Sequence, residues 1–349
     1  KSRESNRKEK QKMKRIKAKL TKAGHFELFE EQMPELKEDE VLLKMISVGL
    51  CHSDVPAYLG TSAMGKSPLG FEAMVKNIQY PMGLGHEPVA VVQEIGRSVT
   101  KFKPGDYVTG VSSECFTSHM MLNENKRLVK IPDTEKPIDA CLGEPMMCVA
   151  NIVQAANPRF GDHVAVIGCG FMGLLAIAGL KNDRLGSLTA IDFDSDRLKL
   201  AEKYGASETI CPLHEDLQSS MMNITKGKGF DVVIEITGSL KGLASALQII
   251  RIAGRGKILA PSMYTKNEIF TEEMAYNMMY RSPIIHVVHP WYCENYMDVL
   301  KKAVDAYVKD IFPTDKLITH RIPVTEINEG FQLLTTNPKE YIKGIITFN

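Results

Sequence analysis

The chain has 349 residues, of which 44% are hydrophobic and 24% charged, and its formal net charge is +1. This length is enough for two domains of roughly 150 residues each, and two domains predict a cleft between them. Because the charge is balanced, the composition excludes a protein that relies on a strongly basic surface to bind a nucleic-acid backbone.

The seven cysteines are odd in number, scattered, and free of any CxxC pair. A disulfide framework is therefore not expected, and we predict a reducing, cytoplasmic compartment. No apolar run reaches the length of a membrane-spanning helix, and the first residues lack the apolar core of a signal peptide. We expect a soluble protein whose partner is a small molecule, with neither a nucleic acid nor a membrane involved.

The first part of the chain has a β-rich texture. Residues 1–12, "KSRESNRKEKQK", are charged and polar and predict a disordered tail. From Ile16 to about Asp139 the apolar runs are short and separated by Gly, Pro and Asp, as in "EVLLKMISVGL" and "PVAVVQEIG". This pattern predicts an antiparallel, barrel-like domain.

From about residue 150 strands and helices alternate. "HVAVIGCG" leads into "FMGLLAIAGLK", "SLTAIDFD" into "SDRLKLAEKYG", and "FDVVIEITG" into "LKGLASALQII". Nearly continuous apolar strands between helices indicate a doubly wound α/β domain, with a parallel sheet covered on both faces. The chain after about residue 290 returns to short strands and helices that can fold back onto the first domain. We therefore predict a discontinuous β-rich domain, residues 13–152 and 291–349, around an α/β domain at residues 153–290.

A glycine-rich turn follows the first strand of the α/β domain. Gly168, Gly170 and Gly173 have G-x-G-x-x-G spacing, which permits a tight turn, close approach of a pyrophosphate, and close packing of helix on strand. Asp192 ends the second strand, where its carboxylate can accept hydrogen bonds from ribose hydroxyls and would repel a 2′-phosphate. The sequence thus predicts an NAD site rather than an NADP site. Three further residues are predicted to contact NAD: Phe171, Met172 and Thr237.

Residues 49–54, "GLCHSD", are either a metal site with a proton donor beside it or a polar loop. Two segments downstream supply partners, because "GHEP" contains His86 and Glu87 and "LGEP" contains Glu144. A catalytic zinc needs three protein ligands from N, S and O donors and an open fourth position. Cys51, His86 and Glu144 supply one donor of each kind, so we predict a zinc site at these residues.

These motifs, with "KPGDYV" at residues 103–108 and "LITHRIPVTEINEGFQLL" near the end, resemble the zinc-dependent medium-chain alcohol and polyol dehydrogenases over nearly the whole chain. The resemblance implies a Rossmann fold for the α/β domain and a GroES-like fold for the discontinuous catalytic domain. It also implies that Cys51 and His86 are zinc ligands. Glu144 falls where the family has its third ligand or a water-bridging carboxylate, as in the sorbitol dehydrogenase branch.

The resemblance gives roles to further residues. Ser53 falls on the hydroxyl that begins a proton relay. Asp54 and Glu87 fall on carboxylates that orient the metal ligands or exchange with them, so either Glu144 or Glu87 can be the third ligand. Three more cofactor contacts are implied, the first two near the pyrophosphate and the third near the adenosine ribose: His52, Lys343 and Arg197.

Two features depart from the family pattern. The region after "GDYVTG" holds only Cys115, so the four cysteines that bind a structural zinc in many relatives are missing, and we expect one zinc per chain. The interval between Cys51 and His86 is longer than usual because residues 59–84 form an insertion. We expect the insertion to be either a lid over the substrate or a contact between subunits. Its apolar side chains include Met64, Leu69, Phe71 and Met74.

The predicted reaction is the interconversion of a secondary alcohol and a ketone by hydride transfer to or from NAD. The zinc site with a carboxylate favours a polyol or sugar alcohol, whereas the apolar insertion favours a bulky alcohol such as a hydroxysteroid. A zinc-free quinone or enone reductase would not need the three ligands together. A catalytically inactive nucleotide-binding protein would not need Ser53 beside them.

The apolar segment "SPIIHVVHP" ends the α/β unit and predicts assembly. An apolar strand at a sheet edge can pair with its copy across a two-fold axis. We therefore expect a homodimer, or a homotetramer built from such dimers.

Overall fold

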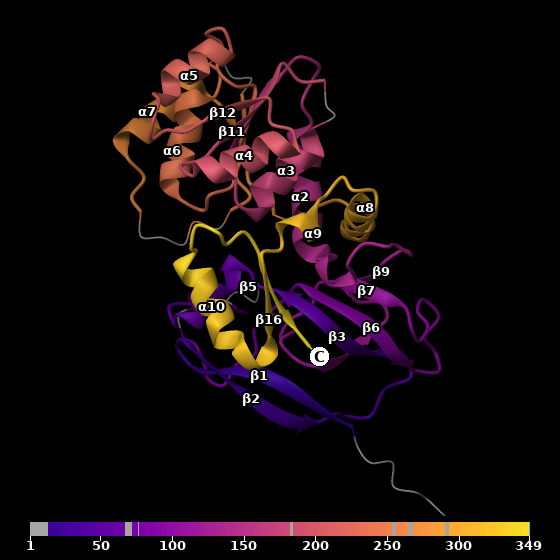
Figure 1. Ribbon diagram of the computed structural model, residues 1–349. Coiled ribbons are helices and arrows are strands. Elements are labelled where there is room, and N and C mark those ends of the chain that lie inside the picture. The colour runs from indigo at the N-terminus through magenta and orange to yellow at the C-terminus, as the bar shows by residue number, and fades with distance from the viewer. Residues whose placement is uncertain are drawn as a thin grey trace, which may run out of the picture.

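The computed structural model describes residues 13–66, 72–75, 77–181, 184–252, 256–262, 264, 268–289 and 293–348. The predicted tail at residues 1–12 lies outside these ranges, as do Leu69 and Phe71 of the insertion and the side chains of Met64 and Met74. The described chain forms two lobes joined by helices (Figure 1). Among the described residues, no helix is both long and apolar enough to cross a bilayer.

The first lobe, residues 163–286, is called the parallel lobe and lies at the top of Figure 1. Its six-stranded sheet has the order β12-β11-β10-β13-β14-β15, and all neighbouring strands are parallel. The strands are β10 (His163–Ile167), β11 (Ser187–Ile191), β12 (Glu208–Ile210), β13 (Val232–Glu235), β14 (Lys257–Leu259) and β15 (Ile284–His286). The helices are α3 (Phe171–Leu180), α4 (Ser195–Tyr204), α5 (Leu217–Ile224), α6 (Leu240–Ile249) and α7 (Glu272–Arg281).

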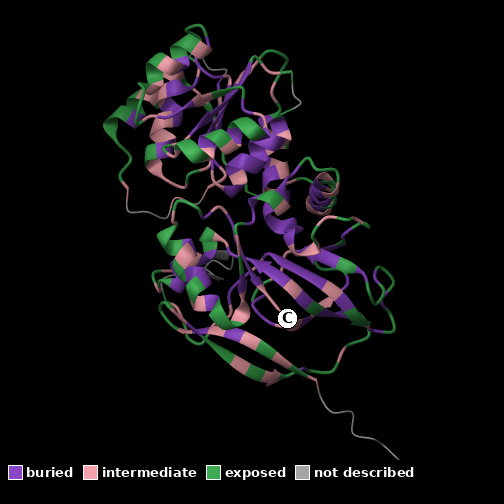
Figure 2. Cartoon of the chain, in the orientation of Figure 1, coloured by how far each residue is buried: buried purple, intermediate pink, exposed green. Residues whose placement is uncertain are grey.

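The continuous apolar run of β10 reflects burial on both faces of the sheet. Val164 and Val166 pack into the core that includes α3 and α4, whereas Ala165 and Ile167 pack into the core that includes α5, α6 and α7. Successive strand residues point to opposite faces, so neither face tolerates polar side chains here. Figure 2 shows the strands of this sheet as buried and the outer faces of the helices as exposed. The doubly wound domain predicted from the sequence is confirmed.

Local chemistry sets the ends of α4. The Asp194 side chain accepts hydrogen bonds from the backbone N–H groups of Asp196 and Arg197 at the start of the helix. Gly205 follows the last residue with φ of 126°, a conformation that favours glycine. The helix therefore ends at Gly205.

The second lobe, called the mixed lobe, combines residues from both ends of the chain. Its seven-stranded sheet has the order β16-β17-β3-β6-β7-β9, with β8 paired to β3. The strands are β3 (Glu40–Gly49), β6 (Pro88–Ile95), β7 (Tyr107–Gly110), β8 (His119–Asn123), β9 (Leu128–Lys130), β16 (His320–Pro323) and β17 (Gly344–Thr347). Because β17 pairs antiparallel with β3, the C-terminal segment is held beside Gly49, the first residue of "GLCHSD".

Smaller elements complete the mixed lobe. Two antiparallel hairpins join β1 (Lys14–Lys22) to β2 (His25–Gln32) and β4 (Ala63–Lys66) to β5 (Glu72–Val75). The second hairpin lies within the predicted insertion. The helices are α1 (Val55–Tyr58), α9 (Thr314–Leu317) and α10 (Ile327–Thr336), with the short 3-10 turns His52–Asp54, Ile138–Ala140 and Val324–Glu326.

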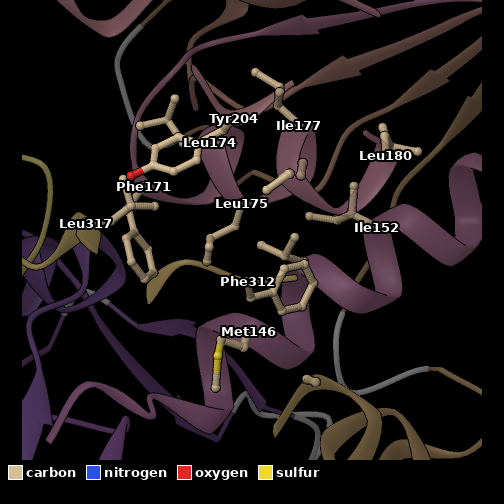
Figure 3. Packing of buried hydrophobic residues seen from close by; sticks show 14 of the residues in the cluster. Met146, Ile152, Phe171, Leu174, Leu175, Ile177, Leu180, Tyr204, Phe312 and Leu317 are labelled. Atoms are coloured by element: carbon tan, nitrogen blue, oxygen red, sulfur yellow. The ribbon is translucent and has the colours of Figure 1, made fainter. Parts of the chain in front are cut away.

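Helix α2 (Gly143–Ala156) joins the two lobes and packs against α3 and α8 (Tyr296–Val308). Figure 3 shows Met146 and Ile152 of this helix close to Leu175 of α3 and to Phe312. Full burial of one such side chain contributes roughly 1.5–3 kcal/mol. The predicted domain boundary at residues 152 and 153 falls inside α2, so this helix belongs to both lobes. The boundary at residues 290 and 291 lies outside the described residues.

Candidate metal and nucleotide sites

The "GLCHSD" residues lie where β3 ends. The strand stops at Gly49, and the chain then turns through the 3-10 helix His52–Asp54. β6 runs antiparallel to β3 and starts directly after Glu87. The hydrogen bond from Gly49 N to Glu87 O, 3.0 Å, holds the two segments together. This pairing brings His86, a predicted zinc ligand, and Glu87, the alternative to Glu144 as third ligand, beside Cys51.

Three side chains form a compact group with metal-ligand chemistry. One ligand atom from each of Cys51, His86 and Glu87 lies within 4.8 Å of the other two. In a tetrahedral zinc site with bonds of about 2.0–2.3 Å, the ligand atoms are roughly 3.5 Å apart. The sulfur, nitrogen and oxygen donors of this group therefore fit a zinc ion after small side-chain adjustments.

Ser53 and Asp54 flank the imidazole of His86 on its two sides. Ser53 Oγ lies 3.3 Å from His86 Nε2 and also donates to Cys51 Sγ at 3.3 Å. His86 Nδ1 lies 3.3 Å from Asp54 Oδ1. Burial alone would lower the pKa of the His86 imidazole, but Asp54 and then Cys51 raise it well above its usual value. Asp54 thus orients a ring whose other nitrogen faces Ser53 and Cys51.

Glu87 is fully buried and is paired with Lys343. Lys343 Nζ lies 2.9 Å from Glu87 Oε1 and 2.7 Å from Oε2, and it also donates to the backbone oxygen of Leu50 at 2.8 Å. The same ammonium lies 5.0 Å from the centre of the Phe171 ring at the start of α3. The structure therefore gives Lys343, predicted near the cofactor pyrophosphate, a partner on the metal side.

Glu144 lies in the first turn of α2 and is only 8% exposed. It is not in the compact group of Cys51, His86 and Glu87. Its Oε1 instead accepts the thiol of Cys148 at 3.3 Å. Burial raises the pKa of the Glu144 carboxyl, and the charge of His86 opposes this change. The carboxyl is thus electrostatically coupled to the metal group without belonging to it.

Two residues of this region were missed by the sequence analysis. Cys148 follows Glu144 by one helical turn, and i, i+4 spacing on a helix was the signal that could have found it. The hydroxyl of Tyr296, at the start of α8, is buried and has no hydrogen-bond partner within the described part of the chain. Burial, then the charge of Glu144, raises the pKa of this hydroxyl. No sequence pattern marked Tyr296, because α8 packs on α2 only in the folded chain.

The glycine-rich turn has the geometry expected of a phosphate-binding loop. Gly168 has φ of 98°, and a Cβ at Gly173 would lie 1.9 Å from Gly168 O, so only glycine fits there. A Cβ at Gly170 would meet no described atom within 4 Å, which leaves the backbone open to a ligand at the N-terminus of α3. Asp192 closes the turn, because its Oδ2 accepts from Cys169 N at 2.7 Å and its Oδ1 from Asp194 N at 2.9 Å.

A cavity of about 370 Å³ lies beside Asp192 and is lined by both lobes. Arg197, predicted near the adenosine ribose, lines it and donates to Tyr341 O at 3.2 Å. Asn337 and Lys339 line it from the mixed lobe, and neither was identified from the sequence. Lys339 Nζ lies 2.5 Å from Asp196 Oδ2 on α4. The segment of residues 337–341 therefore contacts the parallel lobe at this cavity.

The remaining predicted cofactor residues lie around the same turn. Phe171 and Met172 are the first two residues of α3. Thr237 follows β13, and its Cγ2 would lie 3.0 Å from a Cβ at Gly168. His52 is exposed in the 3-10 turn beside Cys51. The predicted residues thus fall into a nucleotide turn and a metal group, and Lys343 contacts both, through Phe171 and Glu87.

Two segments of the chain match families of known proteins. Residues 37–155 match the family described as the alcohol dehydrogenase GroES-like domain, and residues 172–283 match the zinc-binding dehydrogenase family. An L-threonine 3-dehydrogenase from Pyrococcus horikoshii is 30% identical over 267 residues, covering 68% of this chain and 74% of that protein. The chain belongs to the zinc-dependent medium-chain dehydrogenases. It is therefore a zinc- and nicotinamide-dependent oxidoreductase, and the Rossmann and GroES-like folds implied by the resemblance are confirmed.

Other similar proteins cover nearly the whole chain. An erythritol/L-threitol dehydrogenase from Mycolicibacterium smegmatis is 27% identical over 363 residues, covering 91% of this chain and 93% of that protein. The solved structure of an oxidoreductase of unknown specificity from Escherichia coli has a TM-score of 0.82 at 24% identity, covering 97% of this chain and 100% of that chain. The two-lobe arrangement is thus the fold of this dehydrogenase family.

Proposed function

We propose that the protein interconverts a secondary alcohol and a ketone with NAD(H), and that its substrate is a polyol or sugar alcohol. One observation carries the reaction type. The ligand atoms of Cys51, His86 and Glu87 lie within 4.8 Å of one another, and the Ser53 hydroxyl lies against the first two residues. Lys343 lies between this group and the glycine-rich turn, because its ammonium pairs with Glu87 and lies 5.0 Å from the centre of the Phe171 ring.

We propose that Cys51 and His86 hold the zinc and that Glu144, although it lies outside the compact group of Cys51, His86 and Glu87, is the third ligand. Both oxygens of Glu87 lie within 2.9 Å of Lys343 Nζ, so this carboxylate already has a cationic partner. Glu144 has only the weak thiol donor of Cys148 among its described hydrogen bonds. A bound zinc ion supplies Lewis acidity, which lowers the pKa of an alcohol hydroxyl.

Each protein side chain has a separate task in the proposed reaction. Ser53 accepts the alcohol proton as its own proton passes on toward the nicotinamide ribose and solvent, since its hydroxyl is exposed and adjoins the ligand atoms. Asp54 holds the His86 ring through Nδ1, which leaves Nε2 for the metal. The N-terminus of α3 and the open backbone at Gly170 receive the pyrophosphate.

We propose NAD rather than NADP as the cofactor. The Asp192 carboxylate ends β11 beside the 370 Å³ cavity, where it can accept from two ribose hydroxyls and would repel a 2′-phosphate. Arg197 and Lys339 also line this cavity, but Arg197 donates to Tyr341 O and Lys339 pairs with Asp196. These engaged cations favour a neutral ribose at that position.

The relatives narrow the substrate class. L-threonine, erythritol and L-threitol each carry a secondary hydroxyl next to a carbon with a polar substituent, and enzymes named for them are similar to this chain. We therefore propose a substrate with such a neighbouring polar group, with polyols as the first choice and L-threonine as the second. The hydroxysteroid alternative depends on the apolar side chains that the sequence analysis named in the insertion. These side chains lie outside the described residues.

A substrate panel tests the proposal. The purified protein, loaded with one equivalent of zinc, is assayed for NADH formation with tetritols, pentitols, hexitols, L-threonine and hydroxysteroids. We expect turnover of a tetritol or larger polyol, and none with the metal-free protein. Turnover of hydroxysteroids alone would refute the polyol assignment. Absence of turnover with every secondary alcohol, in a protein that binds NAD and zinc, would support the inactive nucleotide-binding alternative.

We also propose one zinc per chain, a homodimer or homotetramer, and a cytoplasmic location. All seven cysteines are free, which suits a reducing compartment. β15 is the edge strand of the parallel sheet; Ile284 of this strand is 57% exposed, and Val287, which directly follows the strand, is 69% exposed. Such an apolar edge favours pairing with a second copy. Elemental analysis checks the zinc content, and two zinc ions per chain would contradict the proposal. Sedimentation velocity checks the assembly, and a monomer at micromolar concentration would contradict it.

A further inference from the structure

Helix α2 carries a thiol that the dehydrogenase reaction does not require. Cys148 lies four residues after Glu144, so the two side chains project from the same face of the helix. Cys148 Sγ donates to Glu144 Oε1 at 3.3 Å. Among the hydrogen bonds of the described residues, this is the only one that reaches the Glu144 carboxylate.

The Glu144 carboxylate has two oxygens, and the thiol occupies one of them. A carboxylate that binds a zinc ion through one oxygen usually has the other oxygen held by a donor, because that contact fixes the orientation of the group. Glu144 is 8% exposed, so water has little access to replace such a donor. Glu87, the competing carboxylate, is held instead by the ammonium of Lys343.

We propose that Cys148 is a positioning residue for Glu144: its thiol fixes Oε1 and directs Oε2 toward the zinc or its bound water. The thiol acts through the carboxylate and is not itself a zinc ligand. The two acidic groups beside the metal are thus set by different donors, a thiol for Glu144 and an ammonium for Glu87. This inference rests on the proposed function, since it takes Glu144 as the third ligand.

Replacement of Cys148 by serine or by alanine separates the donor from the volume of the side chain. Serine and alanine are smaller than cysteine by about the same volume, but only the serine side chain keeps a hydrogen-bond donor. Loss of an outer hydrogen-bond partner typically weakens metal binding by about 10- to 100-fold. Because a thiol is a weak donor, we expect Cys148→Ala to raise the apparent dissociation constant for zinc about tenfold. Cys148→Ser should stay within about threefold of the unmodified protein.

The experiment measures metal affinity by chelator competition and the visible spectrum of the Co²⁺-substituted protein. The thiolate-to-cobalt band should be equal in the unmodified protein and in both variants, because Cys51 alone supplies the sulfur ligand. A second background, Glu144→Gln, tests the path of the effect. If the thiol acts through the carboxylate, Cys148→Ala should change the affinity of the Glu144→Gln protein by less than twofold.

Several results would overturn the inference. An equal loss of affinity in the alanine and serine variants would mean that Cys148 acts through packing. A weaker thiolate-to-cobalt band in both variants would make Cys148 a ligand, and unchanged affinity in both would give it no role. Failure of the proposed function looks different, because the unmodified protein would then bind no metal or oxidise no alcohol.

Discussion

The nucleotide turn consists mainly of backbone groups, whereas the metal group consists of side chains. From Gly168 to Asp192 the site lies within one strand-helix-strand unit, and its contacts are mostly backbone: amides, a positive φ and an open helix N-terminus. The metal group instead joins side chains that follow β3 and precede β6, with Lys343 of the C-terminal segment and Glu144 of α2 beside them. A site made from backbone depends on a few small residues, whereas a site made from side chains depends on every chemical group in it.

The largest expected effect is the loss of one ligand from the metal group. Cys51→Ser should lower alcohol oxidation by at least about a thousandfold, or about 4 kcal/mol of activation free energy, because the Lewis acid is lost with the thiolate. Steady-state kinetics and elemental analysis check this result. Cys211→Ser, a buried cysteine of the parallel lobe, is the control and should keep its zinc. A fully active, zinc-free Cys51→Ser protein would disprove the ligand assignment.

The second effect concerns the buried ion pair between Lys343 and Glu87 of the metal group. Lys343→Met leaves the Glu87 carboxylate, which is 0% exposed, without its cationic partner. Breaking a buried ion pair from one side costs about 3–5 kcal/mol of unfolding free energy. Urea unfolding of the metal-free protein measures this change.

The control for this variant is Lys339→Met, which breaks the solvent-exposed ion pair with Asp196. Because water screens both exposed side chains, loss of this pair should leave the free energy of unfolding nearly unchanged. If both variants lose the same small amount of stability, the Lys343–Glu87 pair is not a structural element of the site.

The third effect tests the nucleotide turn through its backbone. A Cβ at Gly170 meets open space, so Gly170→Ala should fold normally yet occupy the place where a pyrophosphate approaches. We expect NAD affinity to fall by about 10- to 100-fold, or about 1.4–2.8 kcal/mol, with unchanged thermal stability. Fluorescence titration with NADH measures the affinity. Unchanged affinity would show that the phosphates bind elsewhere.

The smallest effect concerns cofactor choice. Asp192→Ala removes the carboxylate that would repel a 2′-phosphate, so the preference for NAD over NADP should narrow by about tenfold, or about 1.4 kcal/mol. Both cofactors should bind more weakly, because Cys169 N and Asp194 N lose their acceptor. The ratio of kcat/KM for NAD and NADP measures this change, with Asp298→Ala as the control, because Asp298 pairs with Lys302 and neither residue lines the Asp192 cavity. Equal use of both cofactors by the unmodified protein would contradict the assignment.

The sequence by itself determined the elements with local causes. The apolar run of β10, the glycine spacing of the turn, the Gly205 helix end and the position of Asp192 all follow from periodicity and backbone chemistry within a short segment. The pairing of "CHSD" with "GHE" also came from sequence motifs, although their contact depends on β3 and β6 lying antiparallel.

Only the tertiary structure decided which side chains meet over long distances along the chain. It paired Lys343 with Glu87 instead of leaving it at an open surface, because β17 lies against β3. It placed Asn337 and Lys339 at the Asp192 cavity and ran α2 through the predicted domain boundary. Such contacts depend on how sheets and helices pack, and no periodicity within one segment encodes them.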